Sequence, residues 1–372
     1  PGLIDLHLHA PQFPFRGSKM DLELLDWLKE NAFLEEMKYS DLEYAKKSYK
    51  IFVEAMKKSA TTRACIFASR HKDATKLLCE MLEQTGLITY VGKVNMDREA
   101  PEALLDKSVE ESIKETEELI LFNKNLKRTK MILTPRFILS CTSKLLKELE
   151  VLQNKYQIPV QSHLSENPGE IKWVANHYKD YAFYGEGYDR FGLFGKSKTN
   201  KPVKTIMAHC VWSTKEEQDR MRENGVWVAH CPASNANLSS GIAPIRKYLD
   251  NDLKIGLGSD IGAGQTESIF RAMIDAIFVS KLYWRLVDSN SKPLCFNEAF
   301  YLATMGGGSF FGNVGSFLKG YELDALVLDD SIFPHPQELS IAERLERFAY
   351  LSGDLVGLKA KFVAGELVYH KE

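Results

Sequence analysis

The sequence has no long hydrophobic run and no excess of charge of either sign. No apolar stretch approaches the roughly 20 residues that a membrane-spanning helix needs, so we expect no membrane segment in this chain. The 48 basic and 50 acidic side chains leave a formal net charge of −2. This near balance predicts no general affinity for nucleic acids or anionic membranes.

Cysteine is scarce, and no two cysteines form a C-x-x-C pair. In a chain of 372 residues this pattern predicts no disulfide framework, and reduced thiols in a cytoplasmic protein are the simpler interpretation. The sequence opens at Pro1 without an initiator Met, so we expect further residues upstream, where a signal peptide would change the predicted location. The six thiols belong to Cys65, Cys79, Cys141, Cys210, Cys231 and Cys295.

Several cofactor motifs are missing. The glycines at Gly262 and Gly264 do not complete the dinucleotide-binding fingerprint, and there is no Walker A pattern. The H-x-E and P-C-x-x-C signature of the cytidine-type zinc deaminases is also absent, so the fold of those enzymes is not implied.

Short apolar segments of β type alternate with amphipathic helical segments along most of the chain. Leu145, Leu149 and Leu152, for example, recur at helical spacing. Eight apolar segments separated by helices predict a parallel sheet covered on both faces. Eight is also the number of strands that closes an α/β barrel of the (β/α)8 TIM type, and an open doubly wound sheet is the alternative. The eight segments are 2–9, 61–69, 88–94, 131–134, 159–163, 203–209, 225–231 and 255–260.

The pattern changes after residue 281, where two β-rich stretches at 324–329 and 358–370 replace the alternation. These strands are too few for an independent fold. We therefore predict a barrel domain over residues 1–320. Residues 321–372 are predicted to be the C-terminal part of a small β-sandwich domain whose N-terminal strands lie upstream of this sequence.

Five side chains suited to metal binding fall where predicted strands end. His7 and His9 are two residues apart on the first strand, so they share one face and can reach the same point. His163 ends the fifth predicted strand, His209 the sixth and Asp260 the eighth. A barrel keeps its active site at the carboxyl ends of its strands. Imidazole nitrogens and a carboxylate oxygen meeting there predict a site for a divalent transition metal such as zinc.

Glu166 is a candidate for proton transfer in such a site. It lies three residues after His163, where the chain leaves the fifth strand. A carboxyl group there can hydrogen-bond both an attacking water and a substrate nitrogen. The alternative interpretation is a glutamate that stabilises a helix N-terminus.

The motifs that contain these residues resemble the amidohydrolase superfamily, and their order covers the whole predicted barrel. The resemblance implies that His7, His9, His163, His209 and Asp260 hold the metal and that Glu166 transfers protons. Some members bind two metals across a carboxylated lysine at the end of strand four. Residues 131–136 contain no lysine at that end, so a single ion is implied. The motifs are PGLIDLHLHAPQ at 1–12, SHLSE at 162–166, MAHC at 207–210, AHCPASN at 229–235 and GLGSD at 256–260.

Within the superfamily the chain resembles the guanine deaminases. Gln12 matches the glutamine that reads the base in that family, and Arg136-Phe137 matches its arginine-phenylalanine pair. A guanidinium and an amide can together read the donors and acceptors of a guanine edge. The other interpretations are a barrel-rim ion pair for Arg136 and a solvated loop for Gln12.

Three further residues carry weaker expectations. His230 and Asn235 lie in the AHCPASN motif, and we interpret them as side chains that orient ligands or loops. Trp27 is a candidate to close over a substrate, although an apolar stripe at helical spacing is more often part of a core.

The expected function is hydrolysis of guanine to xanthine and ammonia, with one Zn²⁺, or iron, bound by a cytoplasmic homodimer. In this mechanism Asp260 takes a proton from water, Glu166 delivers protons to the base, and Gln12, Arg136 and Phe137 hold it. One alternative is a related aminohydrolase or chlorohydrolase acting on another purine, nucleoside or triazine. Two further alternatives are a hydrolase of cyclic amides and a metal-binding scaffold with little catalytic activity.

Overall fold

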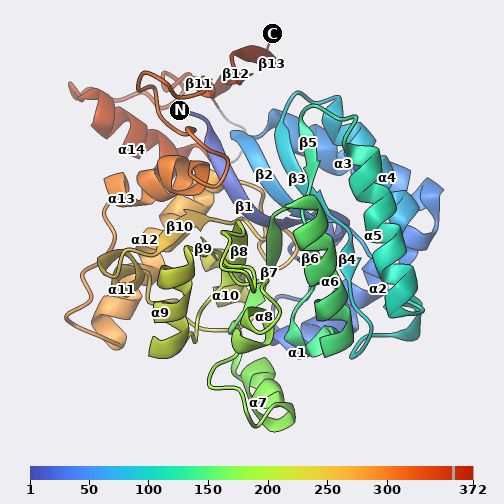
Figure 1. The fold of residues 1–372 in the computed structure, drawn as a ribbon. Coiled ribbons are helices and arrows are strands. Elements are labelled where there is room, and N and C mark those ends of the chain that lie inside the picture. The colour runs from blue at the N-terminus through green and yellow to red at the C-terminus, as the bar shows by residue number, and fades with distance from the viewer. Residues whose placement is uncertain (354–356, 372) are drawn as a thin grey trace.

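The computed structural model describes residues 1–353 and 357–371 and contains eight parallel strands arranged around a common axis (Figure 1). Four of them form a sheet in the order β1-β2-β3-β5, and four form a sheet in the order β10-β9-β8-β7. Each predicted apolar segment overlaps one of these strands. The strands are β1 Leu3–His9, β2 Thr61–Phe67, β3 Ile88–Gly92, β5 Thr129–Met131, β7 Val160–Leu164, β8 Thr205–His209, β9 Trp227–His230 and β10 Lys254–Leu257.

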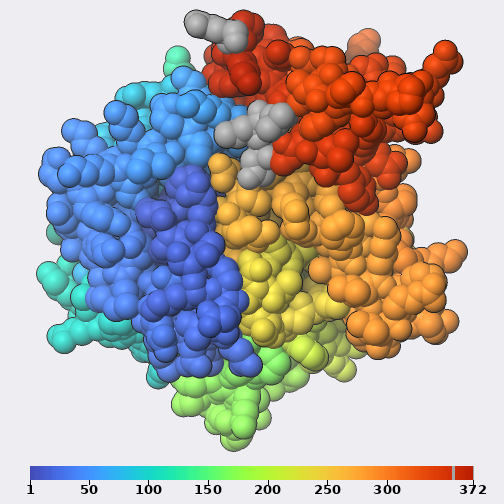
Figure 2. Space-filling model, turned by 180° about the vertical axis from the view of Figure 1, so that it is seen from behind, coloured from blue at the N-terminus to red at the C-terminus, as the bar shows by residue number. Residues whose placement is uncertain are grey.

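The two sheets meet along two seams and close a (β/α)8 barrel. At one seam Leu133, just after β5, forms a parallel bridge with Val160 of β7. At the other seam the backbone N–H of Asp260 donates to the carbonyl of His7 over 2.8 Å. On the outer face in Figure 2, the blue N-terminal residues lie beside yellow and orange residues that come much later in the chain. The barrel prediction is confirmed, and the open sheet is wrong.

Helices cover the barrel and begin at side chains that cap them. Asp41 accepts hydrogen bonds from two backbone N–H groups at the start of α3, and Thr214 accepts one at the start of α9. The sequence pattern predicts Ser143 as the cap of α6, and this is wrong, because the cap is Thr142, which accepts from the backbone N–H of Leu145. The longer helices are α3 Leu42–Lys58, α4 Lys72–Glu83, α5 Val109–Asn123, α6 Ser143–Tyr156, α7 Pro168–His177, α9 Lys215–Asn224, α12 Ile269–Leu286 and α14 Ile341–Leu351.

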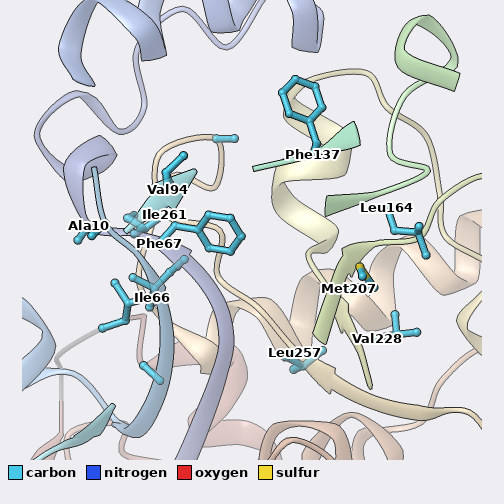
Figure 3. Packing of buried hydrophobic residues seen from close by; sticks show 14 of the residues in the cluster. Ala10, Ile66, Phe67, Val94, Phe137, Leu164, Met207, Val228, Leu257 and Ile261 are labelled. Atoms are coloured by element: carbon cyan, nitrogen blue, oxygen red, sulfur yellow. The ribbon is translucent and has the colours of Figure 1, made fainter. Parts of the chain in front are cut away.

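The apolar core lies between these helices and the sheet. Met207 of β8 pairs with Val228 of β9, and both side chains are buried in this core (Figure 3). All six cysteines are free thiols, five of them buried, as the reduced state predicts. Among the described residues, no helix is both long and apolar enough to cross a membrane.

The chain between β1 and α3 is more ordered than the sequence pattern indicates. It forms a run of short helical segments, of which the sequence pattern indicates only the apolar stripe at helical spacing around Trp27. Four-residue helices bury too few residues to show a 3.6-residue period. The segments are η1 Ala10–Phe15, α1 Leu24–Trp27, η2 Leu28–Ala32, α2 Phe33–Glu36 and η3 Met37–Ser40.

The C-terminal residues form a three-stranded antiparallel sheet of β11 Ala325–Leu328, β12 Leu358–Val363 and β13 Glu366–His370. This sheet lies at the end of the barrel where β1 begins, close to both termini (Figure 1). α14 lies between β11 and β12 in the sequence and packs on α12 of the barrel. The division at 320/321 stays a prediction, and positions 354–356 and 372 of the second part lie outside the described residues.

Candidate active site

The side chains singled out for metal binding come together at the carboxyl ends of the strands. Nε2 of His9 lies 3.2 Å from Nε2 of His163. One carboxylate oxygen of Asp260 lies 3.2 Å from Nε2 of His7 and 3.4 Å from Nε2 of His9, and the other lies 3.9 Å from Nε2 of His209. Five donor groups predicted from four separate strand ends therefore face one small volume.

This donor set has the chemistry of a divalent metal site. Two groups, His7/His163/His209 and His7/His9/Asp260, each hold three ligand atoms within 4.8 Å of one another. Burial lowers the pKa of His7 below its ordinary value and the pKa values of His9 and His163 well below theirs. Neutral imidazoles offer a lone pair to a cation. Nε2 of His7 is buried without a hydrogen-bond partner in the described chain, as expected for a ligand atom.

Two of the imidazoles have an oxygen acceptor at Nδ1, the ring nitrogen that points away from the centre of the site. Nδ1 of His163 lies 2.6 Å from the backbone carbonyl oxygen of Arg136, and Nδ1 of His209 lies 2.9 Å from the side-chain oxygen of Asn235. Each contact places the ring proton on Nδ1 and turns Nε2 toward the centre of the site. His209 itself has a left-handed backbone, with φ of 72°. A non-glycine residue held in that region at a strand end is typical of a functional site.

The prediction that Asp260 ends its strand is wrong. β10 ends at Leu257, and Asp260 lies three residues beyond it in a left-handed conformation, with φ of 46°. The buried carboxyl of Asp5 fixes this turn, because it accepts hydrogen bonds from the backbone N–H of Ser259 over 3.0 Å and from its hydroxyl over 2.5 Å. Burial would raise the pKa of Asp260, but the imidazoles around it, His7 first among them, lower that pKa well below its ordinary value.

Glu166 lies beside the donor set, with one carboxyl oxygen 3.4 Å from Nε2 of His209. The hydroxyl of Ser240 donates to its other oxygen over 3.3 Å. Burial, and then the nearby Asp260, raise the pKa of Glu166 well above its ordinary value, so this carboxyl can hold a proton near neutral pH. Its backbone N–H donates to Glu170 over 2.5 Å. Glu166 precedes the helix α7 rather than capping it, since that cap is Asn167.

A pocket of about 390 Å³ opens onto these groups. Gln12, Arg136 and Phe137 line it, so the structure brings all three predicted base-binding residues to the site. Trp27 also lines it and is 2% exposed, so this residue belongs both to the core and to the pocket wall. The remaining lining residues are His9, Leu24, Leu28, His163, Glu166, His209, Leu238, Asp260 and Ala263.

The sequence interpretation missed Glu36. This residue ends α2 and is buried, and its carboxylate accepts hydrogen bonds from both Arg136 and Gln12. Arg136 is therefore an ion-pair residue and a pocket residue at once, and Gln12 is not solvated. No sequence motif marks Glu36, because it lies 24 positions from Gln12 and 100 from Arg136.

His230 ends β9 and is buried, but its imidazole contacts none of the predicted ligands by a hydrogen bond. Both ring nitrogens lack a hydrogen-bond partner within the part of the chain that the structure describes. Burial lowers the pKa of His230 to about 3, so it is neutral. Its backbone carbonyl accepts from Gly258, which joins β9 to the turn that carries Asp260.

The chain belongs to the Amidohydrolase family, whose sequence profile matches residues 1–368. It is 37% identical over 382 residues to the guanine deaminase of Mus musculus, an alignment that covers 99% of this chain and 82% of the relative. The crystal structure of guanine deaminase from C. acetobutylicum, with guanine bound in its active site, has a TM-score of 0.95 and 46% identity, covering 99% of this chain and 86% of that one. E. coli guanine deaminase has a TM-score of 0.90 and 34% identity, covering 100% and 84% of the two chains.

Proposed function

We propose that this chain is a guanine deaminase, a hydrolase that converts guanine and water into xanthine and ammonia by cleaving a cyclic amidine C–N bond. One observation carries the proposal. A single pocket joins the imidazole and carboxylate set, a buried protonatable Glu166, and the Gln12 and Arg136 pair that resembles the base-binding pair of the guanine deaminases. Similarity to guanine deaminases over almost the whole chain supports the same assignment.

We propose that His7, His9, His163, His209 and Asp260 hold one Zn²⁺, with iron as the other ion that these donors accept. A bound ion of this kind lowers the pKa of a coordinated water toward neutrality. The single-ion proposal is supported by the pocket wall, where none of the described lining residues is a lysine that could bridge a second ion.

The protein's carboxyl groups then move the protons. Asp260 is ionised and accepts a proton from the water that attacks the carbon bearing the amine. The new bond to the water oxygen makes that carbon tetrahedral, and Glu166 gives its own proton to the adjacent ring nitrogen. Glu166 next carries the remaining hydroxyl proton to the amine, and ammonia leaves. The proton on Asp260 then passes to Glu166 and replaces the one that Glu166 gave to the ring. The products thus gain one proton from Glu166 and one from the water, and both carboxyl groups are restored.

Gln12, Arg136 and Phe137 are proposed to hold the base in register with these groups. Gln12 and Arg136 are buried polar groups, so they favour a ligand that satisfies their hydrogen bonds and penalise one that does not. Phe137 is buried, and its ring centroid lies 6.4 Å from that of His163, which places an apolar surface beside the reacting centre. Their contribution is orientation.

The test is an assay of guanine loss by ultraviolet absorbance, with ammonia measured in parallel, before and after chelation. We expect equal amounts of xanthine and ammonia, no activity after chelation and recovery with zinc. Guanosine, adenine, cytosine and amino-triazines are assayed beside guanine. Turnover of one of these compounds without turnover of guanine would reassign the substrate and leave the family unchanged.

We also propose a homodimer, supported by apolar side chains that share one exposed face of α12 and α14. Phe278 and Tyr350 are in ring contact across the two helices, with centroids 6.1 Å apart, and are 45% and 39% exposed. Leu282 and Leu286, one and two turns after Phe278 on α12, are 50% and 77% exposed. Apolar surface of this kind marks an interaction site. Light scattering should give a dimer mass for the wild type and a monomer mass for Leu286→Lys, whereas a monomeric wild type would refute the proposal.

A further inference from the structure

Glu36 lies directly behind the two side chains proposed to read the base. It is 1% exposed and is not one of the described residues that line the pocket. Its carboxylate accepts a hydrogen bond from Nε2 of Gln12 over 2.8 Å, from Nη1 of Arg136 over 2.5 Å and from Nη2 of Arg136 over 3.0 Å. One carboxylate from α2 is therefore the shared partner of two pocket-wall groups that come from different parts of the chain.

This contact decides which way the amide of Gln12 is turned. A carboxylate can only accept hydrogen bonds, so Gln12 has to present its nitrogen to Glu36. The carbonyl oxygen of Gln12 can then accept from a ligand, while Glu36 takes one of the two N–H donors of Nε2. That oxygen lies against Gly262, where an added Cβ would come within 2.3 Å of it. The backbone φ of +122° at Gly262 also disfavours any larger residue there. Glu36 therefore fixes the carbonyl oxygen of Gln12 as the acceptor that this side chain can offer to a ligand.

The same carboxylate balances the charge of Arg136. Two parallel N–H···O bonds join the groups, and both are buried, so the pair has no net charge. The guanidinium carries five N–H donors, of which Glu36 takes two. The N–H groups that remain can donate to an uncharged acceptor on a ligand. An acceptor from Gln12 beside donors from Arg136 complements a lactam, in which a ring N–H donates and the neighbouring carbonyl accepts.

We propose that Glu36 is a positioning residue that selects the lactam edge of an oxopurine, an inference that rests on the proposed deamination of guanine. 2,6-Diaminopurine is the matched probe. It carries the same amine on the same reacting carbon as guanine, but an amine replaces the carbonyl and the neighbouring ring nitrogen has no hydrogen. The lactam edge is thereby replaced by one with the reverse order of donor and acceptor. The ratio of kcat/KM for guanine to kcat/KM for 2,6-diaminopurine contains the reading of this edge and the intrinsic reactivity of the two purines. Because the intrinsic reactivity is the same for every variant, a change in the ratio between variants measures the reading of the edge.

The test compares this ratio in the wild type, Glu36→Gln and Glu35→Gln. A glutamine at position 36 can accept from Arg136 and donate to Gln12, so Gln12 loses its fixed orientation. We expect kcat/KM for guanine to fall about a hundredfold in Glu36→Gln, mainly through KM, and the ratio to fall about tenfold or more. Glu35 is the adjacent buried carboxylate, but its partners are Lys38 and Tyr44, so Glu35→Gln should keep the wild-type ratio.

The outcomes separate this role from a merely structural one. If Glu36→Gln lowers kcat/KM for both substrates by the same factor, the proposal is overturned, because lost stability or lost active enzyme affects both alike. If that variant does not fold, Gln12→Met tests the same link from the pocket side, and an unchanged ratio there also overturns the proposal. A wild type that deaminates neither purine would overturn both this inference and the proposed function. If the wild type deaminates guanine but Glu36→Gln and Gln12→Met both keep the wild-type ratio, this inference alone is overturned.

Discussion

The side-chain oxygen of Asn235 lies 2.9 Å from Nδ1 of His209. Because an amide oxygen accepts a hydrogen bond, the imidazole proton belongs on Nδ1 and the lone pair on Nε2. That Nε2 faces Glu166 at 3.4 Å and Asp260 at 3.9 Å. Asn235 therefore sets the tautomer in which His209 can bind a cation, which agrees with its interpretation from the sequence as an orienting residue.

Asn235→Ala should weaken metal binding by about 10- to 100-fold, since the imidazole loses the partner that fixes its tautomer. Asn235→Asp keeps an oxygen acceptor at the same place and should stay closer to the wild type. Competition with a coloured zinc chelator measures both affinities. Equal affinity in the alanine variant and the wild type would show that His209 is held by other contacts or is not a ligand.

Glu166→Gln should lower kcat for guanine by about 10²- to 10⁴-fold while the metal content stays at the wild-type level. The amide keeps the shape of the side chain and cannot carry the proton that the ring nitrogen and the amine require. Metal analysis and steady-state kinetics on the same preparation separate lost chemistry from a lost ion. Activity close to wild type would remove Glu166 from the mechanism.

His7→Ala should abolish the stabilisation that zinc provides. Nε2 of His7 belongs to both groups of ligand atoms in the site. A ligand that binds only the folded state raises the unfolding temperature, so zinc should raise the Tm of chelator-treated wild type and leave that of His7→Ala unchanged. His177 on α7 is exposed and stacks on Trp173, so His177→Ala is the matched control that should respond like the wild type. A similar rise in Tm for all three proteins would place the ion elsewhere.

The sequence predicts the barrel and the metal-binding set because both depend on local order. A strand of period two puts His7 and His9 on one face, and alternation of strand and helix brings the strand ends together. Asp260 is less predictable, since its place depends on a turn held by Asp5, more than 250 residues away. Glu36 is not predictable at all from periodicity, because α2 has only four residues and its partners are distant in the chain.

The stability of the protein should depend on Glu170 between weakly acidic and neutral pH. Burial, and then the nearby Glu166, raise the pKa of Glu170 from 4.5 to about 7. Between these values the folded state binds more protons than the unfolded chain, so this group lowers the free energy of unfolding as the pH rises. Glu170→Gln removes the titration. Urea titrations give the free energy of unfolding of Glu170→Gln minus that of the wild type at each pH. This difference should increase by on the order of 1–3 kcal/mol between about pH 5 and about pH 8. A constant difference across this range would contradict the assignment.

Lys361 should be a main link between the C-terminal sheet and the barrel. It is fully buried on β12, and its Nζ donates to the carbonyl oxygens of Met56, Ser59 and Thr61 over 3.0, 2.9 and 2.9 Å. Met56 lies in the last turn of α3, Ser59 just after that helix and Thr61 at the start of β2, at the end of the barrel away from the pocket.

Lys361→Met should lower the free energy of unfolding by about 2–4 kcal/mol, because three buried carbonyl groups lose the ammonium donor and only that of Met56 keeps a second side-chain donor, the hydroxyl of Ser59. Lys359 lies two residues earlier on the same strand, with a side chain that is 50% exposed and paired to Asp329. Lys359→Met should therefore change the stability by less than about 0.5 kcal/mol. Guanidinium unfolding of both variants and a kcat measurement in buffer test the idea. Equal destabilisation of the two variants would mean that the buried ammonium has no special role, and a large loss of kcat in Lys361→Met would mean that the sheet communicates with the distant pocket.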